Sequence, residues 1–280
     1  MRTALVTDST ADLPKPLRER LGVFVVPLYV NLGGRVYRDW EEITPTEIFA
    51  KVRSGEAFPT TSQPSPEDFA RVYGEALKGA DHVLSIHISS KLSGTLQSAL
   101  LAAESFPGRV TVFDSQAASL GVGMMVLRAH ELLRAGQGLA EVLKELERIR
   151  ADHFVRFTVA TLEFLKRGGR IGGAQAFLGT LLNIKPILTL KEGRVETAGR
   201  ARGERKAREE IVKDFRAWAT GRGKVRAFFL YSGEEEAVRE LKEMVLASGL
   251  PVEEALVSEL GAVIASHTGP GTYGFYAYSL

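Results

Sequence analysis

Hydroxyl and acidic side chains cluster at four points of this sequence, and three of these clusters directly follow an apolar run. Those three are Asp8-Ser9-Thr10, residues 89–95 (SSKLSGT) and Asp114-Ser115. The fourth, Thr60-Thr61-Ser62-Gln63, precedes a predicted helix. Hydroxyls and free backbone N–H groups together bind an anion or a carboxylate without a metal or a lysine. Serine and threonine also cap helices and close turns, so it is their gathering at predicted strand ends that favours a binding site.

Three other segments have residue types that are common in binding sites. His267 stands among small residues in the segment 266–271 (SHTGPG), which we expect to be a loop; there it faces a pocket or serves as a turn residue. The glycines of segment 167–173 (RGGRIGG) permit close approach of another backbone, and its arginines hold a phosphate or form surface salt bridges. The basic segment 200–206 (RARGERK) is either a solvated helix start or a docking surface for an acidic partner.

Several familiar catalytic motifs are excluded. The segment 269–274 matches G-x-G-x-x-G by letter, but it ends six residues before the C-terminus and leaves no room for the helix of a dinucleotide site. The sequence has no P-loop, no G-x-S-x-G and no S-x-x-K motif. His82 and His87 lie at an odd separation on one predicted strand, so they point to opposite faces and do not chelate together. We therefore interpret both as structural histidines, and no residue cluster predicts a metal site.

The elements that would position these clusters alternate between strand and helix in the first half of the chain. Continuous apolar runs predict buried strands, as in a parallel sheet covered on both faces; they are 4–7, 23–30, 83–88 and 110–113. Thr44-Pro45-Thr46-Glu47 is a capping box, and Ser65-Pro66 is a second helix start. The helices are expected to extend to about Ser54 and Leu77, and a third to begin near Gly94 and end before Pro107. This order predicts an N-terminal α/β domain with a Rossmann-like, doubly wound parallel sheet.

The second half of the sequence predicts its own mixed α/β domain. An amphipathic, charged helix over 138–152 comes first, and we place the boundary after it, giving domains 1–154 and 155–280. The strands predicted beyond the boundary are 157–162, 184–190, 195–198, 225–231, 254–259 and 275–280. The predicted helices are 162–167, 175–182, 204–219 and 234–247.

Composition sets limits on function and location. The chain has 280 residues, 36 Lys plus Arg against 34 Asp plus Glu, and a formal charge of +2, which gives no electrostatic reason to expect nucleic acid or an anionic membrane as a partner. It has no cysteine, which excludes disulfides, thiol catalysis and thiolate metal sites. We find no signal peptide and no apolar run near the ~20 residues needed to span a bilayer, so we expect a cytoplasmic protein.

Six segments together resemble the DegV family in order and spacing. This family consists of bacterial fatty-acid-binding proteins, including the carrier subunit of fatty acid kinase. The resemblance covers nearly the whole chain. The segments that carry it are 7–13 (TDSTADL), 59–66 (PTTSQPSP), 88–95 (ISSKLSGT), 162–171 (LEFLKRGGRI), 183–188 (NIKPIL) and 267–271 (HTGPG).

The resemblance implies two α/β domains that enclose one long-chain fatty acid. It implies that hydroxyls hold the carboxylate: Thr61 and Ser93, with Ser62 and the Gly94 backbone beside them, and that His267 lies nearby. It also implies that Arg202 contacts a separate kinase catalytic subunit, which supplies ATP and metal and converts the presented acid to an acyl-phosphate. The chain itself would then be a lipid carrier, without enzymatic activity or a cofactor of its own.

Two other functions remain open on the residues alone. A serine hydrolase or acyltransferase would use Ser93 and His267, with Asp8 or Asp114 orienting the histidine. An anion- or phosphosugar-binding module would use the hydroxyl-rich loops for a water-soluble ligand. Ser93 would be labelled covalently by a fluorophosphonate in the first case, and no lipid would copurify in the second.

Overall fold

The first half of the chain builds a four-stranded parallel sheet with the order β2-β1-β6-β7. The computed structural model describes residues 2–179 and 184–280. The strands of this sheet are β1 (Thr3–Asp8), β2 (Phe24–Val26), β6 (His82–His87) and β7 (Val110–Asp114). The helices α3 (Pro66–Ala76) and α4 (Thr95–Ala103) pack on one face and α5 (Leu120–Arg134) on the other. The predicted doubly wound sheet is confirmed, and its strand order reverses between β1 and β6.

The predicted helix starts are confirmed in detail. Thr44 and Ser65 each accept a bond from the backbone N–H three residues later, and the acidic side chain there bonds back to the cap. Each helix has proline at its first position, where a missing N–H costs nothing. These caps start α2 (Pro45–Arg53) and α3. The preceding helix, α1 (Lys15–Leu21), was not predicted.

A small antiparallel sheet, ordered β4-β3-β5, was also not predicted. It consists of β3 (Tyr29–Leu32), β4 (Arg35–Arg38) and β5 (Thr60–Ser62). The prediction of one strand over 23–30 is wrong, because β2 ends at Val26 and β3 begins at Tyr29 in a different sheet. Pro27 lacks the N–H that a continuing strand needs, and the next N–H, that of Leu28, donates to the Ser9 hydroxyl at 2.9 Å.

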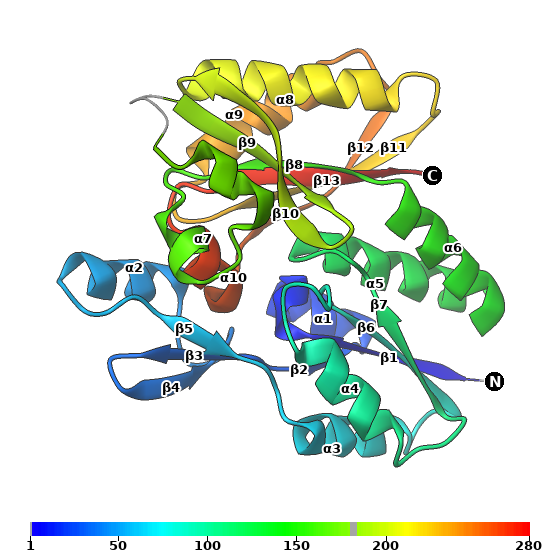
Figure 1. Cartoon of the computed structure of the whole chain (residues 1–280). Coiled ribbons are helices and arrows are strands. Elements are labelled where there is room, and N and C mark those ends of the chain that lie inside the picture. The colour runs from blue at the N-terminus through cyan, green and yellow to red at the C-terminus, as the bar shows by residue number, and fades with distance from the viewer. Residues whose placement is uncertain (1, 180–183) are drawn as a thin grey trace.

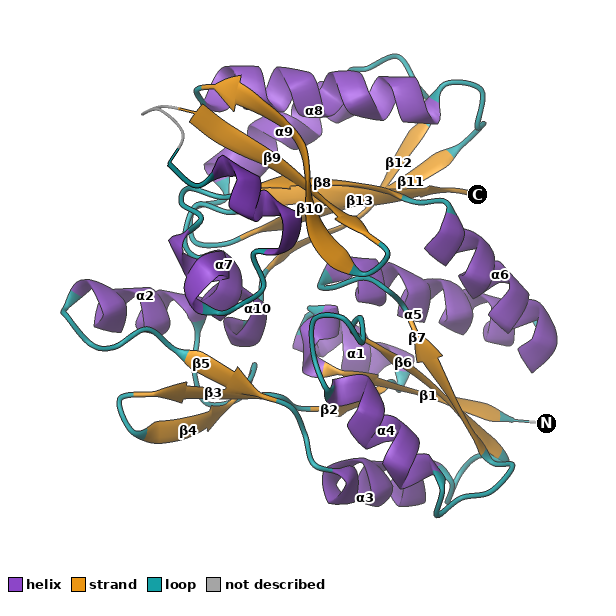
Figure 2. Cartoon of the chain, in the orientation of Figure 1, coloured by secondary structure: helices purple, strands orange, loops and turns teal. Residues whose placement is uncertain are grey.

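The second half builds a six-stranded mixed sheet with the order β10-β9-β8-β13-β11-β12. The β11–β12 pair is parallel and the other described pairs are antiparallel. The strands are β8 (Phe154–Thr158), β9 (Ile184–Lys191), β10 (Arg194–Arg202), β11 (Val225–Tyr231), β12 (Val252–Glu259) and β13 (Tyr273–Ser279). Helices α8 (Glu204–Ala219) and α9 (Glu236–Leu246) cover the outer face (Figures 1 and 2).

Most predicted elements of this half are confirmed, and two are displaced. The strand predicted over 157–162 is wrong in position, because β8 ends at Thr158. The helix predicted over 175–182 falls partly on residues 180–183, which lie outside the described residues; the 3₁₀ helix η2 (Gly172–Phe177) takes its first part. The amphipathic helix predicted over 138–152 is α6 (Leu139–Ala151), and short α7 (Glu163–Arg167) follows β8.

Helix α5 lies between the two large sheets (Figure 1). Its residues Leu120 to Val126 are all buried. A Cβ at Gly121 would lie 2.5 Å from the ring of Tyr276 on β13. A Cβ at Gly123 would lie 2.6 Å from the carbonyl oxygen of Ala11, in the 3₁₀ helix η1 (Ser9–Ala11) that follows β1. Residues two apart on a helix point in nearly opposite directions, so the two glycines let both halves of the molecule approach one helix.

Candidate functional site

An apolar cavity lies between the two large sheets, against helix α10 (Ala262–Thr268). Its wall includes side chains from both halves of the chain, among them Leu28, Ile88, Phe157, Leu190, Leu230 and Val263. The cavity follows α10 from Val263 to Thr268, which is about 7.5 Å at the helical rise per residue. It also follows the chain from Thr272, directly before β13, to Tyr276 within it, about 13 Å at the rise of a strand.

Polar side chains from three elements meet at one end of this cavity. Thr61 comes from β5, Ser93 from the segment that follows β6, and His267 from the last turn of α10. Thr61 Oγ1 lies 2.7 Å from His267 Nε2. Ser93 Oγ lies 2.8 Å from Thr95 Oγ1 and accepts the Thr95 backbone N–H at 3.3 Å. Our prediction that His267 sits in a loop is wrong, since α10 extends to Thr268 and holds the imidazole rigidly.

His267 is neutral at physiological pH. Desolvation by burial and the nearby Arg170 guanidinium lower its pKa to about 4. The Nδ1 atom is buried and has no hydrogen-bond partner among the described residues. It packs against Gly168, where any Cβ would clash with the ring. A neutral imidazole has one N–H, and the short contact to Thr61 places that proton on Nε2 or makes Nε2 the acceptor.

Arg170 lines the same end of the cavity without a carboxylate partner among the described residues. Its Nε donates to the carbonyl oxygen of Leu92 at 2.9 Å, and its Nη1 donates to that of Gly168 at 2.6 Å. These two bonds hold the guanidinium across the two halves of the chain. Its positive charge is therefore available to an anion in the cavity, screened little in these surroundings.

The structure brings Thr61, Ser93 and His267 together, but it does not bring Ser62 or Gly94 to the cavity wall. Alternate residues of a strand point to opposite faces, so Ser62 points away from the cavity, is exposed, and faces the Asn31 amide at 3.4 Å. Gly94 is the N-cap of α4 and packs against the Gln63 side chain. Sequence reasoning missed Thr95 and the place of Arg170; the only signal for Arg170 was its position between two glycine pairs.

Most of the other predicted hydroxyl groups do structural work. Ser9 accepts from Leu28, Thr10 bonds to Asp8, and Ser115 Oγ accepts the Ala117 backbone N–H at 3.1 Å. Arg202, at the end of β10, is exposed and forms no ion pair with the described residues. The hydroxyls of Ser9, Thr10 and Ser115 therefore stabilise local structure, and none of the three lines the cavity.

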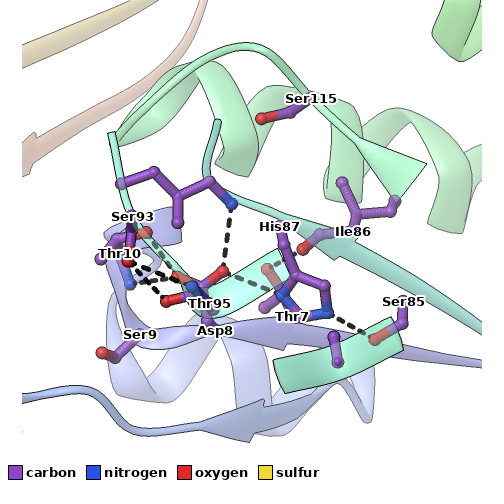
Figure 3. Close-up of polar contacts among 12 residues, drawn as sticks. Thr7, Asp8, Ser9, Thr10, Ser85, Ile86, His87, Ser93, Thr95 and Ser115 are labelled. Carbon is purple, nitrogen blue, oxygen red and sulfur yellow. Dashed lines mark hydrogen bonds and ion pairs between the residues drawn. The ribbon is translucent and has the colours of Figure 1, made fainter. Parts of the chain in front are cut away.

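A hydroxyl–imidazole–carboxylate chain links β1 and β6 away from the cavity wall (Figure 3). His87 Nδ1 lies 2.9 Å from Asp8 Oδ2, and His87 Nε2 lies 2.5 Å from Ser85 Oγ. All three side chains are fully buried, and Ser85 also accepts the Tyr73 hydroxyl at 2.9 Å. No substrate reaches a serine enclosed in this way, so the chain ties β1 to β6 and is not a catalytic triad.

The arrangement at the cavity does not form a hydrolase triad either. His267 contacts Thr61 rather than Ser93, and no described acid bonds its Nδ1. Asp8 is used by His87, and Asp114 bonds to Ser90 and Gln116. In the described part of the chain no three His, Asp or Glu side chains gather as metal ligands. No helix in residues 2–179 and 184–280 is long and apolar enough to cross a membrane.

Comparison with known proteins gives matches over the whole chain. Residues 2–280 match the family model described as "Uncharacterised protein, DegV family". A DegV domain-containing protein of Deinococcus radiodurans is 46% identical over 98% of this chain and 97% of its own length. A Thermus thermophilus structure, described as fatty acid binding of a DegV family protein, has 81% identity and a TM-score of 0.99, with all of both chains covered. A stearic-acid-binding protein from Eubacterium ventriosum has 27% identity and a TM-score of 0.90, covering 98% of this chain and 97% of its own.

Proposed function

Since the chain belongs to the DegV family, we propose that it is a long-chain fatty-acid-binding protein that presents the bound carboxylate to a separate kinase subunit. The observation that carries this proposal is one largely apolar cavity whose wall also contains the hydroxyls of Thr61 and Ser93, a neutral imidazole, and an arginine that has no carboxylate partner among the described residues. That distribution matches an amphiphile with a long apolar chain and one anionic head. The structures from Thermus thermophilus and Eubacterium ventriosum described above support the same ligand class.

The acyl chain supplies most of the binding free energy. Each CH₂ group removed from water contributes roughly 0.8 kcal/mol, so a sixteen-carbon chain contributes on the order of 10 kcal/mol. The polar end then has to orient the head and to replace its lost hydration. Two hydroxyl donors and a nearby cation do both, since a charge-assisted hydrogen bond contributes about 1.5–3 kcal/mol.

The contacts of Thr61 and Ser93 allow each hydroxyl to donate its proton to the ligand. Ser93 Oγ accepts the Thr95 backbone N–H, and when the Thr95 hydroxyl donates to its second lone pair, the Ser93 O–H is free for the ligand. If His267 carries its proton on Nε2, it donates to Thr61, and the Thr61 O–H is free to donate to the carboxylate. We therefore assign the Nε2–H tautomer to His267 in the complex, which leaves Nδ1 as an unprotonated nitrogen facing Gly168.

The chain lacks the means to transfer a phosphoryl group by itself. Such transfer depends on a phosphate-cradling loop and metal ions, and the sequence has no P-loop motif. A partner that holds ATP therefore has to approach the carboxylate end of the cavity. We propose that exposed Arg202 belongs to the surface that this kinase subunit contacts.

The binding proposal is tested first by mass spectrometry of an organic extract from the purified, denatured protein. A stoichiometric long-chain fatty acid supports it, whereas a lipid-free extract, also after incubation with mixed fatty acids, refutes it. Ser93→Ala is expected to weaken fatty-acid binding by about ten- to a hundredfold. Ser90→Ala is the matched control, because Ser90 is exposed in the same segment and bonds only to Asp114.

The partner proposal is tested with purified kinase subunit, ATP and fatty acid. Arg202→Ala is expected to retain the lipid but to slow acyl-phosphate formation. Arg194→Ala is the control, since Arg194 is exposed at the other end of the same strand and forms no ion pair with the described residues. Equal phosphorylation rates for wild type and Arg202→Ala would remove Arg202 from the contact surface.

A further inference from the structure

The cavity wall contains a polar side chain that the proposed head-group site does not use. Ser119, which directly precedes α5, lines the cavity and lies beside Asp12, whose carboxyl group accepts the Gly261 N–H at the start of α10. His267 stands in the last turn of that helix, five residues beyond Ala262, or about 7.5 Å along the helix axis. Ser119 therefore faces the middle or distal part of a bound acyl chain rather than its carboxylate.

The Ser119 hydroxyl is buried and only weakly partnered. The residue is only 4% exposed, and its Oγ forms no hydrogen bond of normal geometry with the described residues, although it lies close enough to the Asp12 carboxyl to lower the pKa of that group. Native proteins leave few buried polar atoms without a partner. A hydroxyl at the wall of an apolar cavity is where a polar atom of a ligand would complete the missing bond.

Two buried carboxyl groups lie behind Ser119, and each also has an unpartnered oxygen. Asp12 Oδ1 accepts the Gly261 N–H at 2.9 Å and the Trp40 indole N–H at 3.3 Å, while Oδ2 has no partner. Asp39 Oδ1 accepts the Val263 N–H at 3.1 Å, and its Oδ2 likewise has none. One oxygen of each acid thus holds the start of α10, and the other remains free.

Both acids bind protons more tightly than ordinary aspartates. Burial and the neighbouring Asp39 raise the pKa of Asp12 well above its usual range, against the opposing effect of Ser119 beside it. Burial raises the pKa of Asp39 to about 7. A carboxyl group that gains a proton offers one O–H donor and one acceptor. Ser119 in front of Asp12 offers the same pair of functions.

We propose that Ser119, backed by Asp12, forms a second polar subsite in the cavity that binds a hydroxyl group on the middle of the acyl chain. The ligand class is a mid-chain hydroxy fatty acid, held at its carboxylate by Thr61 and Ser93 and at its hydroxyl by Ser119. This inference rests on the proposed fatty-acid function and deepens it. A hydroxyl both donates and accepts, so it complements the Ser119 hydroxyl and the Asp12 oxygen behind it, whereas an unsubstituted chain leaves them unpaired or bridged by water.

The test compares stearic acid with stearic acid hydroxylated at mid-chain, by displacement of a fluorescent fatty acid. Wild type is expected to bind the two acids within about threefold of each other. In a wholly apolar cavity an unpaired hydroxyl weakens binding by about ten- to a hundredfold. Ser119→Ala is expected to weaken the hydroxy acid by about tenfold and to leave stearic acid unchanged.

Ser266→Ala is the matched control variant, because Ser266 is a buried serine on α10 whose hydroxyl is satisfied by the Ala262 carbonyl oxygen at 2.7 Å. It is expected to change neither affinity. β-Hydroxystearic acid is the matched control ligand, since its hydroxyl lies near the head group, and Ser119→Ala should not alter its affinity.

The outcomes separate the two proposals. Failure of wild type to bind stearic acid overturns the proposed function itself. Binding of stearic acid with a penalty of about a hundredfold for the mid-chain hydroxyl overturns only the subsite. Equal effects of Ser119→Ala on both acids, or none on either, overturn it as well and assign the free oxygens to a buried water. The wild-type comparison decides the matter even if the variant fails to fold.

Discussion

Replacing Gly168 by alanine should displace His267 without removing any polar group. A Cβ on residue 168 would clash with His267 Nδ1 and would lie 2.9 Å from its Cε1 and 3.2 Å from the carbonyl oxygen of Phe164. Gly168 has a φ of −74° and a ψ of −8°, which alanine adopts without strain. The substitution therefore adds only a steric clash with the His267 ring, and the ring has to move by at least about half an ångström to relieve it.

This shift of the ring disturbs the contact between His267 Nε2 and Thr61 Oγ1, now 2.7 Å apart. Beyond about 3.2 Å an O–H···N bond weakens rapidly, and a bond of this kind contributes about 0.5–1.5 kcal/mol net. We expect Gly168→Ala to lower fatty-acid affinity by about two- to tenfold. Displacement of a fluorescent fatty acid measures this change directly.

Gly74→Ala is the control for this experiment. Gly74 lies within α3, and a Cβ there meets no atom within 4 Å. Alanine favours the helix by about 1 kcal/mol over glycine, so this variant should be more stable and bind normally. If Gly168→Ala bound fatty acid as tightly as wild type while a crystal structure showed the ring displaced, the Thr61–His267 bond would contribute nothing to binding and our assignment would be wrong.

Three other substitutions test the surroundings of the cavity. The folded protein holds a proton on Asp39 up to about pH 7, whereas the unfolded chain loses it near pH 4, so stability should fall by a few kcal/mol, at the order of magnitude, as pH rises between these values. Asp39→Asn should flatten that slope in denaturant unfolding at pH 5 and pH 8, and an unchanged slope contradicts the assignment. Thr95→Val removes the partner of the Ser93 hydroxyl. It should weaken fatty-acid binding by about two- to tenfold at a nearly unchanged melting temperature. Unchanged affinity would show that the Ser93 hydroxyl does not need Thr95 to be oriented toward the ligand. His87→Leu leaves Asp8 Oδ2 without its imidazole partner and should destabilise the fold by about 1–3 kcal/mol in the same unfolding assay, so an unaltered unfolding midpoint would count against the buried chain of Figure 3.

Local signals in the sequence predicted the framework of the fold. Continuous apolar runs located β1, β6 and β7, and the capping boxes at Thr44 and Ser65 located two helices within a residue or two. The bounds of β11 and α8 were predicted without error. In each case the signal lies within the element itself, as burial on both faces or as a terminal cap.

The elements that escaped prediction are those whose signal lies elsewhere in the chain. β5 is a polar tripeptide that becomes a strand only because it pairs with β3. α10 is a seven-residue helix whose start is held by Asp12 and Asp39, more than two hundred residues upstream. Helix α5 is buried all round at its start and so shows no polar face there.

The residues of the candidate site also differ in whether the sequence alone could identify them. The resemblance implied Thr61, Ser93 and His267, which the structure brings to one end of the cavity, although Thr61 and His267 are 206 residues apart. It also implied Ser62, which is exposed on the opposite face of β5 because neighbouring strand residues face opposite ways; its role in binding stays a prediction. Ser119 and Arg170 could not be assigned from the residues, since only the packing of α10 and of the glycine segment brings them to the cavity.

The position of α5 limits how a ligand exchanges with the cavity. Both halves of the chain approach this helix to within the space left by a missing methyl group, Tyr276 of β13 at Gly121 and Ala11 of η1 at Gly123. Separating the halves at the predicted boundary, residue 154, would bring the face of α5 that packs on β13 into water, together with the sheet face that covers it. Each large side chain so exposed costs about 1.5–3 kcal/mol, and the sum reaches the whole stability of an ordinary domain, about 5–15 kcal/mol. Separation of the halves is thus as costly as unfolding, and we expect a ligand to enter and leave the cavity by local movement of the segments around it.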